Sequence, residues 1–105
     1  MTERDIAIAR ELKIKLSKLT SILDFKVFGS RARGEADEYS DMDVFIEVEC
    51  LDKELKREIR HIVWEVGFEN SIHISPLLFT RHELEDTPIR SSPIVINIAE
   101  EGVRI

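Results

Sequence analysis

Apolar residues recur at spacings of three and four along the first part of the chain, from Thr2 to about Leu23. Lysine and arginine side chains fill much of the remaining surface of this segment. The period is typical of an amphipathic helix with one buried stripe. Thr2 and Asp5 resemble a capping box, with Asp in place of the usual Glu or Gln, so the pattern predicts a helix that begins there. The stripe consists of Ile8, Leu12, Leu16, Leu19 and Leu23.

Two apolar stretches in the next part of the chain predict buried strands. The first, Phe25–Phe28, is short and ends at Gly29, which favours a tight turn. The polar segment 31–38 then predicts a loop or a single helical turn. The second stretch, 42–50, mixes β-branched and aromatic residues with acids, as a strand does.

The second half of the chain predicts a long helix and an edge strand. Asp52 is a good N-cap, and Gly67 is the expected end of the helix. Segment 71–79 is a further predicted strand, and because Pro76 interrupts it we expect it at or near a sheet edge. The apolar positions of the helix are Leu55, Ile59, Ile62, Val63 and Val66.

Two shorter helices complete the prediction. Thr80 and Glu83 form a second capping box. Ser92 and Pro93 have the order of an N-cap and a first helical residue, and Gly102 is the expected stop. The expected apolar face of this last helix consists of Ile94, Val95 and Ile98.

The predicted order of elements is helix, strand, turn, strand, helix, strand, helix, helix. This order indicates a small α/β (α+β) domain with helices packed on a short sheet. A chain of 105 residues fits a single domain over residues 1–105, and 43% hydrophobic residues suffice for a core.

Charge and hydropathy narrow the function classes. The net charge of −6 argues against a domain that grips nucleic acid through its phosphates. It does not exclude the binding of a small polyanion, because a bound metal ion can reverse the local electric field. No apolar stretch approaches the roughly 18 residues of a membrane span, and the charged N-terminal segment lacks a signal-peptide core, so we expect a cytoplasmic protein.

Two residues are expected in the core. Cys50 is the only cysteine, which excludes an intramolecular disulfide, and its apolar surroundings predict a small buried side chain. Trp64 lies within the long predicted helix, and we expect it in or near the core.

The candidate chemistry lies in Gly29-Ser30 and Asp41-Met42-Asp43. A glycine at the end of a buried strand lets the backbone turn sharply, and the following N–H groups and the Ser30 hydroxyl can cradle phosphate oxygens. Asp41 and Asp43 are two apart on a strand, so their side chains leave the same face with Cα atoms roughly 6–7 Å apart. Two such carboxylates can hold Mg²⁺. Together the two parts suit phosphoryl or nucleotidyl transfer.

Other motifs are absent. No Gly-Lys-Ser/Thr of a Walker A loop and no Gly-x-Gly-x-x-Gly occurs. The acids of segment 37–43 lack the central glycine and closing glutamate of an EF-hand. The histidines at 61, 73 and 82 lack zinc-like spacing.

Gly29-Ser30, followed by Arg31-Ala32-Arg33-Gly34 and then Ser40-Asp41-Met42-Asp43, resembles the DNA polymerase β-like nucleotidyltransferase superfamily. More closely, the chain from about Phe25 onward resembles the minimal nucleotidyltransferases of prokaryotes. The resemblance implies a polymerase β-like palm fold with a small mixed sheet. It implies that Gly29 and Ser30 contact the triphosphate of ATP or another NTP, while Asp41 and Asp43 ligate Mg²⁺.

The same resemblance implies a partner. Short proteins of this kind are often encoded beside a helical protein of the HEPN class, as antitoxin and toxin. In some of these pairs AMP is transferred to a tyrosine of the toxin. We expect such a helical partner for this chain or, failing that, a homodimer.

One position departs from the family pattern. The family's third carboxylate lies in an apolar-Asp-apolar triplet after the long helix, and the matching triplet here is Ile72-His73-Ile74. Histidine can ligate a metal but adds no negative charge when neutral, so turnover is in question while nucleotide binding is not. His73 is a candidate ligand or catalytic residue; the alternative is a hydrogen-bonded core histidine. Glu47, and less readily Glu49, continue the face of the two aspartates and are candidate substitutes.

The two arginines after Ser30 have two interpretations. Arg31 and Arg33 either steer phosphates or contact a partner, or they pair with Glu35, Asp37 and Glu38 on the surface. Arg33 is our candidate for nucleotide binding. Two functions stay open: an enzyme that transfers a nucleoside monophosphate to a protein hydroxyl, and a catalytically impaired module that neutralises a helical partner by binding it.

Overall fold

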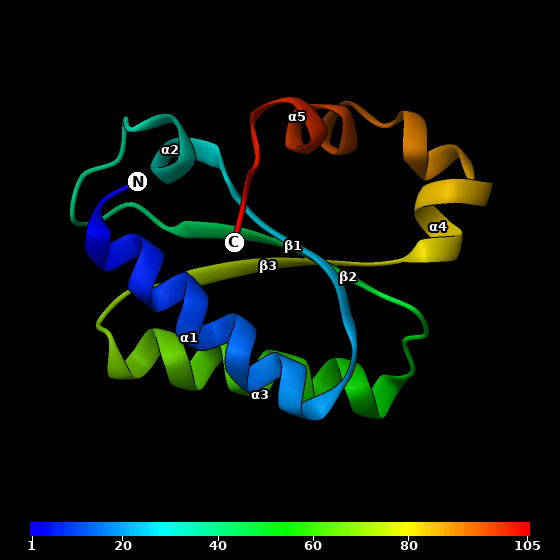
Figure 1. Ribbon diagram of the computed structural model, residues 1–105, viewed down its shortest axis with the longest axis horizontal. Coiled ribbons are helices and arrows are strands. Elements are labelled where there is room, and N and C mark those ends of the chain that lie inside the picture. The colour runs from blue at the N-terminus through cyan, green and yellow to red at the C-terminus, as the bar shows by residue number, and fades with distance from the viewer.

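A four-stranded mixed sheet separates two layers of helices (Figure 1). The structure is a computed structural model that describes residues 1–105. Strand β2 (Met42–Val48) runs antiparallel to β1 (Ile22–Phe28) and parallel to β3 (Ile74–Thr80). The short β4 (Val103–Arg104) pairs antiparallel with β1, which gives the order β3-β2-β1-β4. The predicted mixed sheet flanked by helices is confirmed.

One face of the sheet carries the hydrophobic core. Helices α1 (Glu3–Leu19) and α3 (Lys53–Glu69) lie side by side beneath it in the view of Figure 1. Side chains of a strand alternate between faces, and in β2 the residues that point toward these helices are fully buried. They are Met42, Val44, Ile46 and Val48, and they join the apolar stripes of both helices in one cluster.

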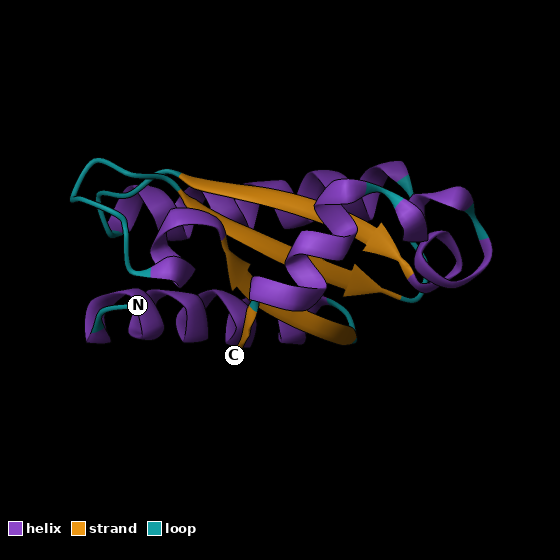
Figure 2. Ribbon diagram, turned by 90° about the horizontal axis from the view of Figure 1, so that it is seen from above, coloured by secondary structure: helices purple, strands orange, loops and turns teal.

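The other face carries shorter helices. Helix α2 (Gly29–Arg33), helix α4 (Arg81–Asp86), the 3₁₀ turn η1 (Pro88–Ser91) and helix α5 (Pro93–Glu101) lie above the sheet in Figure 1. Seen from this side, the strands remain visible between the helices that cross them (Figure 2). Because β2 alternates, this face also receives the half-buried side chains of Asp43 and Glu47. None of the helices is both long enough and apolar enough to cross a membrane.

The first helix is shorter than its apolar stripe predicted. It ends at Leu19, and the extended backbone of Thr20 forms its C-cap. Ile22 instead pairs with Val48 and begins β1, so Leu23 lies in a strand and is 36% exposed. Pairing with the sheet therefore overrode a helical spacing that continued by coincidence.

Helix α3 passes through its predicted stop at Gly67 and ends at Glu69. The glycine serves a different purpose, because a Cβ at this position would lie 2.6 Å from the carbonyl oxygen of Ile72. The chain returning into β3 thus packs directly on the helix backbone, and the Ile72 N–H donates to the Gly67 carbonyl at 2.9 Å. Gly67 permits a close approach rather than a helix end.

Most of the other local predictions are confirmed. Capping boxes occur at Thr2 and Thr80, Asp52 and Ser92 cap α3 and α5, and α5 ends at Gly102. Strand β3 lies at the sheet edge, as its proline predicted. Two elements were not predicted, η1 and β4. In α5 only Ile98 is buried, whereas Ile94 is 46% exposed.

The predictions that Cys50 and Trp64 lie in the core are both wrong. Cys50 is exposed because β2 ends at Val48 and the chain then turns away from the sheet. Trp64 is 62% exposed. Successive residues of a helix point about 100° apart, and the face of α3 that meets the sheet is the one of Ile59, Val63 and Val66.

Candidate functional site

The turn after β1 brings the backbone against a carboxylate. Gly29 has φ +75°, a left-handed conformation that favours glycine, and a Cβ added there would lie 2.4 Å from Asp43 Oδ2. Phe28 pairs with Asp43 across β1 and β2, so the turn lies directly beside this side chain. Helix α2 begins at Gly29 without any side-chain cap. The first N–H groups of a helix have no acceptor within the helix, so they are suited to bind an anion next to Asp43.

Two of the candidate residues meet at the start of two parallel strands. Asp41 directly precedes β2, and His73 directly precedes β3. The pairing of Met42 with Ile74 sets these two residues level, and His73 Nδ1 lies 3.2 Å from Asp41 Oδ1. The His73 side chain is 73% exposed, which excludes the core histidine. His73 therefore faces the aspartates.

The positive charges around Asp43 do not balance the effects that disfavour its ionised form. Partial burial raises the pKa of this carboxyl group, and the neighbouring charge of Asp41 raises it further. Arg33 and His73 act in the opposite direction but do not offset the rise. A bound cation would favour the ionised form of Asp43 and so offset this rise in its pKa.

Arg33 lies at the rim of this site. Its guanidinium donates to Glu35 at 3.0 Å and to Glu101 of α5 at 3.3 Å. The surface pairing with Glu35 is thus present, but the charge also acts on Asp43. The arginine links the helix that carries the turn to α5.

Arg31 follows neither sequence interpretation, because it is buried. Its Nη1 pairs with Asp5 of α1 at 2.8 Å, and both side chains are about 5% exposed or less. Its Nε and Nη2 donate to the Ser40 carbonyl oxygen at 3.1 and 2.6 Å. Nη2 also donates to the carbonyl of Asp37 at 3.4 Å. Arg31 therefore fixes the loop that ends immediately before Asp41.

We expect Arg31→Ala to destabilise the fold by about 3–5 kcal/mol, because it leaves the Asp5 carboxylate buried without its counter-ion. Urea denaturation of the variant would measure this loss. Asp5→Ala should cost a similar amount, and the double variant should cost clearly less than the sum of the two. Strictly additive losses would show that the pair is not coupled.

Glu47 does not join the aspartates. It shares their face of β2, but Phe45 lies between, with its ring packed against Phe79 at a centroid distance of 5.8 Å. Burial and then the charge of Asp24 raise the pKa of Glu47. Glu49 pairs with Arg81 at 3.4 Å. Both glutamates belong to a separate cluster near the other end of the strand.

The donor set fits magnesium with two protein ligands. No group of three or more His, Cys, Asp or Glu side chains in the chain is arranged to hold a metal ion. Asp41 and Asp43 supply hard oxygen donors, and Mg²⁺ in nucleotide sites commonly uses one or two carboxylates, with phosphate oxygens and water completing the octahedron. The backbone N–H groups at the start of helix α2 are donors suited to those phosphate oxygens.

Known proteins are similar to this chain in sequence or in fold. A protein adenylyltransferase of Methanocaldococcus jannaschii is 34% identical over 80 residues, which cover 73% of this chain and 53% of that protein. The chain thus spans about half the length of this curated relative.

Solved structures of low identity show the same fold. A toxin–antitoxin chain crystallised with AMP-PNP matches with TM-score 0.59 at 17% identity, over 90% of this chain and 69% of its own length. A nucleotidyltransferase from Sulfolobus solfataricus matches with TM-score 0.58 at 18% identity, over 97% and 82%. A mutant form of the toxin–antitoxin MntA–HpeT matches with TM-score 0.57 at 17% identity, over 91% and 70%.

A family model described as the nucleotidyltransferase domain matches residues 9–105, which include the Gly29 turn, both aspartates and β4. The chain belongs to the nucleotidyltransferase domain family.

Proposed function

We propose that this chain transfers AMP from Mg-ATP to a hydroxyl group of a protein partner. The observation that carries the proposal is the contact between the Gly29 turn and Asp43, where a Cβ would lie 2.4 Å from Oδ2. This contact supports the proposal because the start of helix α2, which has no side-chain cap and is suited to phosphate, lies beside Asp43, one of the two carboxylates that we propose as metal ligands.

Each residue then has a role. The backbone of Gly29 and the hydroxyl and backbone of Ser30 bind the triphosphate, and Arg33 contributes positive charge at the rim. Asp41 and Asp43 hold Mg²⁺. Held by these two carboxylates, the ion would supply positive charge to the phosphates and help to orient the attacking and leaving oxygens.

The transfer is an in-line displacement at the α-phosphorus. The acceptor hydroxyl oxygen forms a bond to this phosphorus, the bond to the bridging oxygen of the β-phosphate breaks, and pyrophosphate leaves. The hydroxyl proton passes to the imidazole of His73, which Asp41 orients at 3.2 Å.

For the partner we propose a helical protein of the HEPN class, with the two proteins forming a toxin–antitoxin pair. The name of the Methanocaldococcus jannaschii relative supports protein adenylylation, and the toxin–antitoxin chains of similar fold support the pairing. A second candidate function is a catalytically impaired module that neutralises the partner by binding. The histidine at the third ligand position favours this second candidate.

Two glycine variants form a matched test of the nucleotide site. Gly29 and Gly34 have the same left-handed backbone, with φ +75° and +74°, so the backbone strain of an alanine should cost each position a similar amount of about 1–2 kcal/mol. Only at Gly29 does the new Cβ meet Asp43, since nothing lies within 4 Å of a Cβ at Gly34. We expect Gly29→Ala to abolish Mg-ATP binding in calorimetry, while Gly34→Ala retains it.

Equal Mg-ATP affinities in both variants would contradict the site. The two candidate functions are separated by transfer of label from α-labelled ATP to a helical protein encoded in the adjacent reading frame. Labelling supports the enzyme, and a tight complex without labelling supports the binding module.

A further inference from the structure

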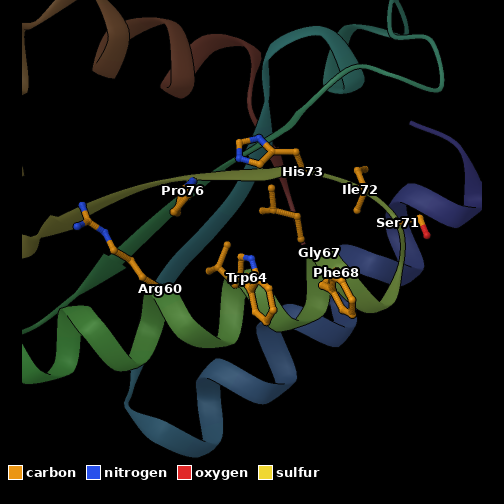
Figure 3. A pocket seen from close by; sticks show the side chains of 10 residues that line it. Arg60, Trp64, Gly67, Phe68, Ser71, Ile72, His73 and Pro76 are labelled. Carbon is orange, nitrogen blue, oxygen red and sulfur yellow. The ribbon is translucent and has the colours of Figure 1, made fainter.

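A groove runs between helix α3 and the edge strand β3, next to the proposed site. Arg60, Trp64 and Phe68 line it from the helix, and Ile72, His73 and Pro76 line it from the segment that forms β3 (Figure 3). Its volume of about 550 Å³ is sufficient for one or two large side chains. His73 is one of the residues that line the groove, while its side chain projects from the side of the strand away from α3 and contacts Asp41. The groove and the candidate site therefore share this residue.

The wall on α3 is an exposed aromatic row. The rings of Trp64 and Phe68 stack with a centroid distance of 5.2 Å, and that of His61 lies 6.4 Å from Trp64. Trp64 is 62% exposed and Phe68 is 71% exposed. Adjoining apolar side chains left in water in this way mark a surface that binds a partner.

The charge of the groove is opposite to that of the chain. The chain carries a net charge of −6, yet no Asp or Glu lines the groove. Arg60 takes part in no ion pair, whereas Arg57, one turn earlier on the same helix, pairs with Glu54 at 3.6 Å. The unpaired guanidinium is complementary to a carboxylate of a docked chain.

The edge of β3 disfavours an added strand. The Met42 N–H donates to the His73 carbonyl, so in this parallel ladder Ile74, Pro76 and Leu78 direct their backbone groups outward. Pro76 has no N–H to donate at the middle of that row. Side chains, rather than a continuous ladder, must therefore hold whatever docks here.

We propose that this groove binds the acceptor polypeptide, an inference that rests on the proposed function. An apolar or aromatic side chain of the acceptor packs between Trp64 and Pro76, and a carboxylate pairs with Arg60. The hydroxyl-bearing residue passes His73 to reach Asp41. The distance along β3 from Pro76 to His73 is about 10 Å, so the anchor and the hydroxyl lie roughly three to five residues apart.

The sole tryptophan of the chain makes the groove directly observable. The probes are two synthetic peptides that share one tyrosine and one leucine at this spacing and differ only in carrying glutamates or lysines. We expect the glutamate peptide to shift Trp64 emission to the blue at a concentration about 10-fold lower than the lysine peptide. Arg60→Glu should invert this order, while the control Arg57→Glu, outside the groove, should preserve it.

Equal binding of both peptides to the wild type and to Arg60→Glu would overturn the proposal. So would a wild-type dimer that dissociates in Arg60→Glu, since a second copy would then cover the groove. The proposed function fails differently: the glutamate peptide binds, but Mg-ATP gives the wild type no thermal stabilisation and the peptide tyrosine gains no label.

Discussion

Replacement of Asp43 by asparagine should remove both nucleotide-dependent stabilisation and AMP transfer. In the wild type, Mg-ATP at about a hundred times its Kd should add about 2.7 kcal/mol to the free energy of unfolding, which raises Tm by roughly 10 °C in a domain of this size. The asparagine side chain offers one neutral oxygen where the metal requires an anionic one, so we expect no shift. Differential scanning calorimetry with and without Mg-ATP measures this. Glu38→Gln, which removes a charge from the exposed loop before β2, should keep the full shift.

In the absence of Mg-ATP, Asp43→Asn should have the opposite effect on the stability of the fold. Because burial and Asp41 raise the pKa of Asp43, the folded chain binds protons more tightly than the unfolded chain. Stability contributed by this group is therefore present at low pH and is lost as pH rises from about 3.8 through the raised pKa. Asp43→Asn removes that loss, so at neutral pH the free variant should be as stable as the wild type or slightly more stable. A wild type that Mg-ATP leaves unchanged at millimolar concentration would contradict the intact site.

His73→Asp should raise AMP transfer to the partner by an amount on the order of 10²-fold. The residue lies 3.2 Å from Asp41, and the family resemblance predicts the third carboxylate at this position. An aspartate there keeps a group that can take the hydroxyl proton and adds a negative ligand for the metal, which a neutral imidazole does not supply. His73→Ala should be slower than the wild type, because it removes the imidazole without a substitute. Single-turnover assays with labelled ATP and the partner would rank the three chains.

The control is His82→Asp, an exposed histidine paired with Asp86 on α4, which should transfer at the wild-type rate. Equal and measurable rates in all three His73 chains would remove any catalytic role from the position. A silent wild type beside an active His73→Asp would make the protein a decayed enzyme that is retained for binding.

The parts of the site that sequence predicted are local. Gly29 follows an apolar strand and adopts the positive φ that favours glycine, and Asp41 and Asp43 share a face because strands alternate. The caps of the helices likewise depend on residues three apart. Such features can be recognised without knowledge of the tertiary arrangement.

The features that sequence missed depend on distant partners. The Arg31 pair joins residues 26 positions apart, and nothing near Asp5 distinguishes it from an ordinary capping acid. The apolar positions of α3 do not fix which of two neighbouring faces of the helix meets the sheet. The exposure of Trp64 therefore depends on where the sheet lies. Strand β4 has only two residues and exists because β1 offers it an edge.

The Asp5–Arg31 pair also sets the N-terminal boundary of the smallest segment that we expect to fold as this domain. The match to the nucleotidyltransferase family model begins at residue 9 of this chain, after Asp5. A chain trimmed to that boundary would retain every motif residue, yet it would leave the Arg31 guanidinium buried with no counter-ion. Swapping or grafting this domain between proteins therefore requires the first turn of α1 to travel with it, because that turn supplies one end of the support beneath Asp41.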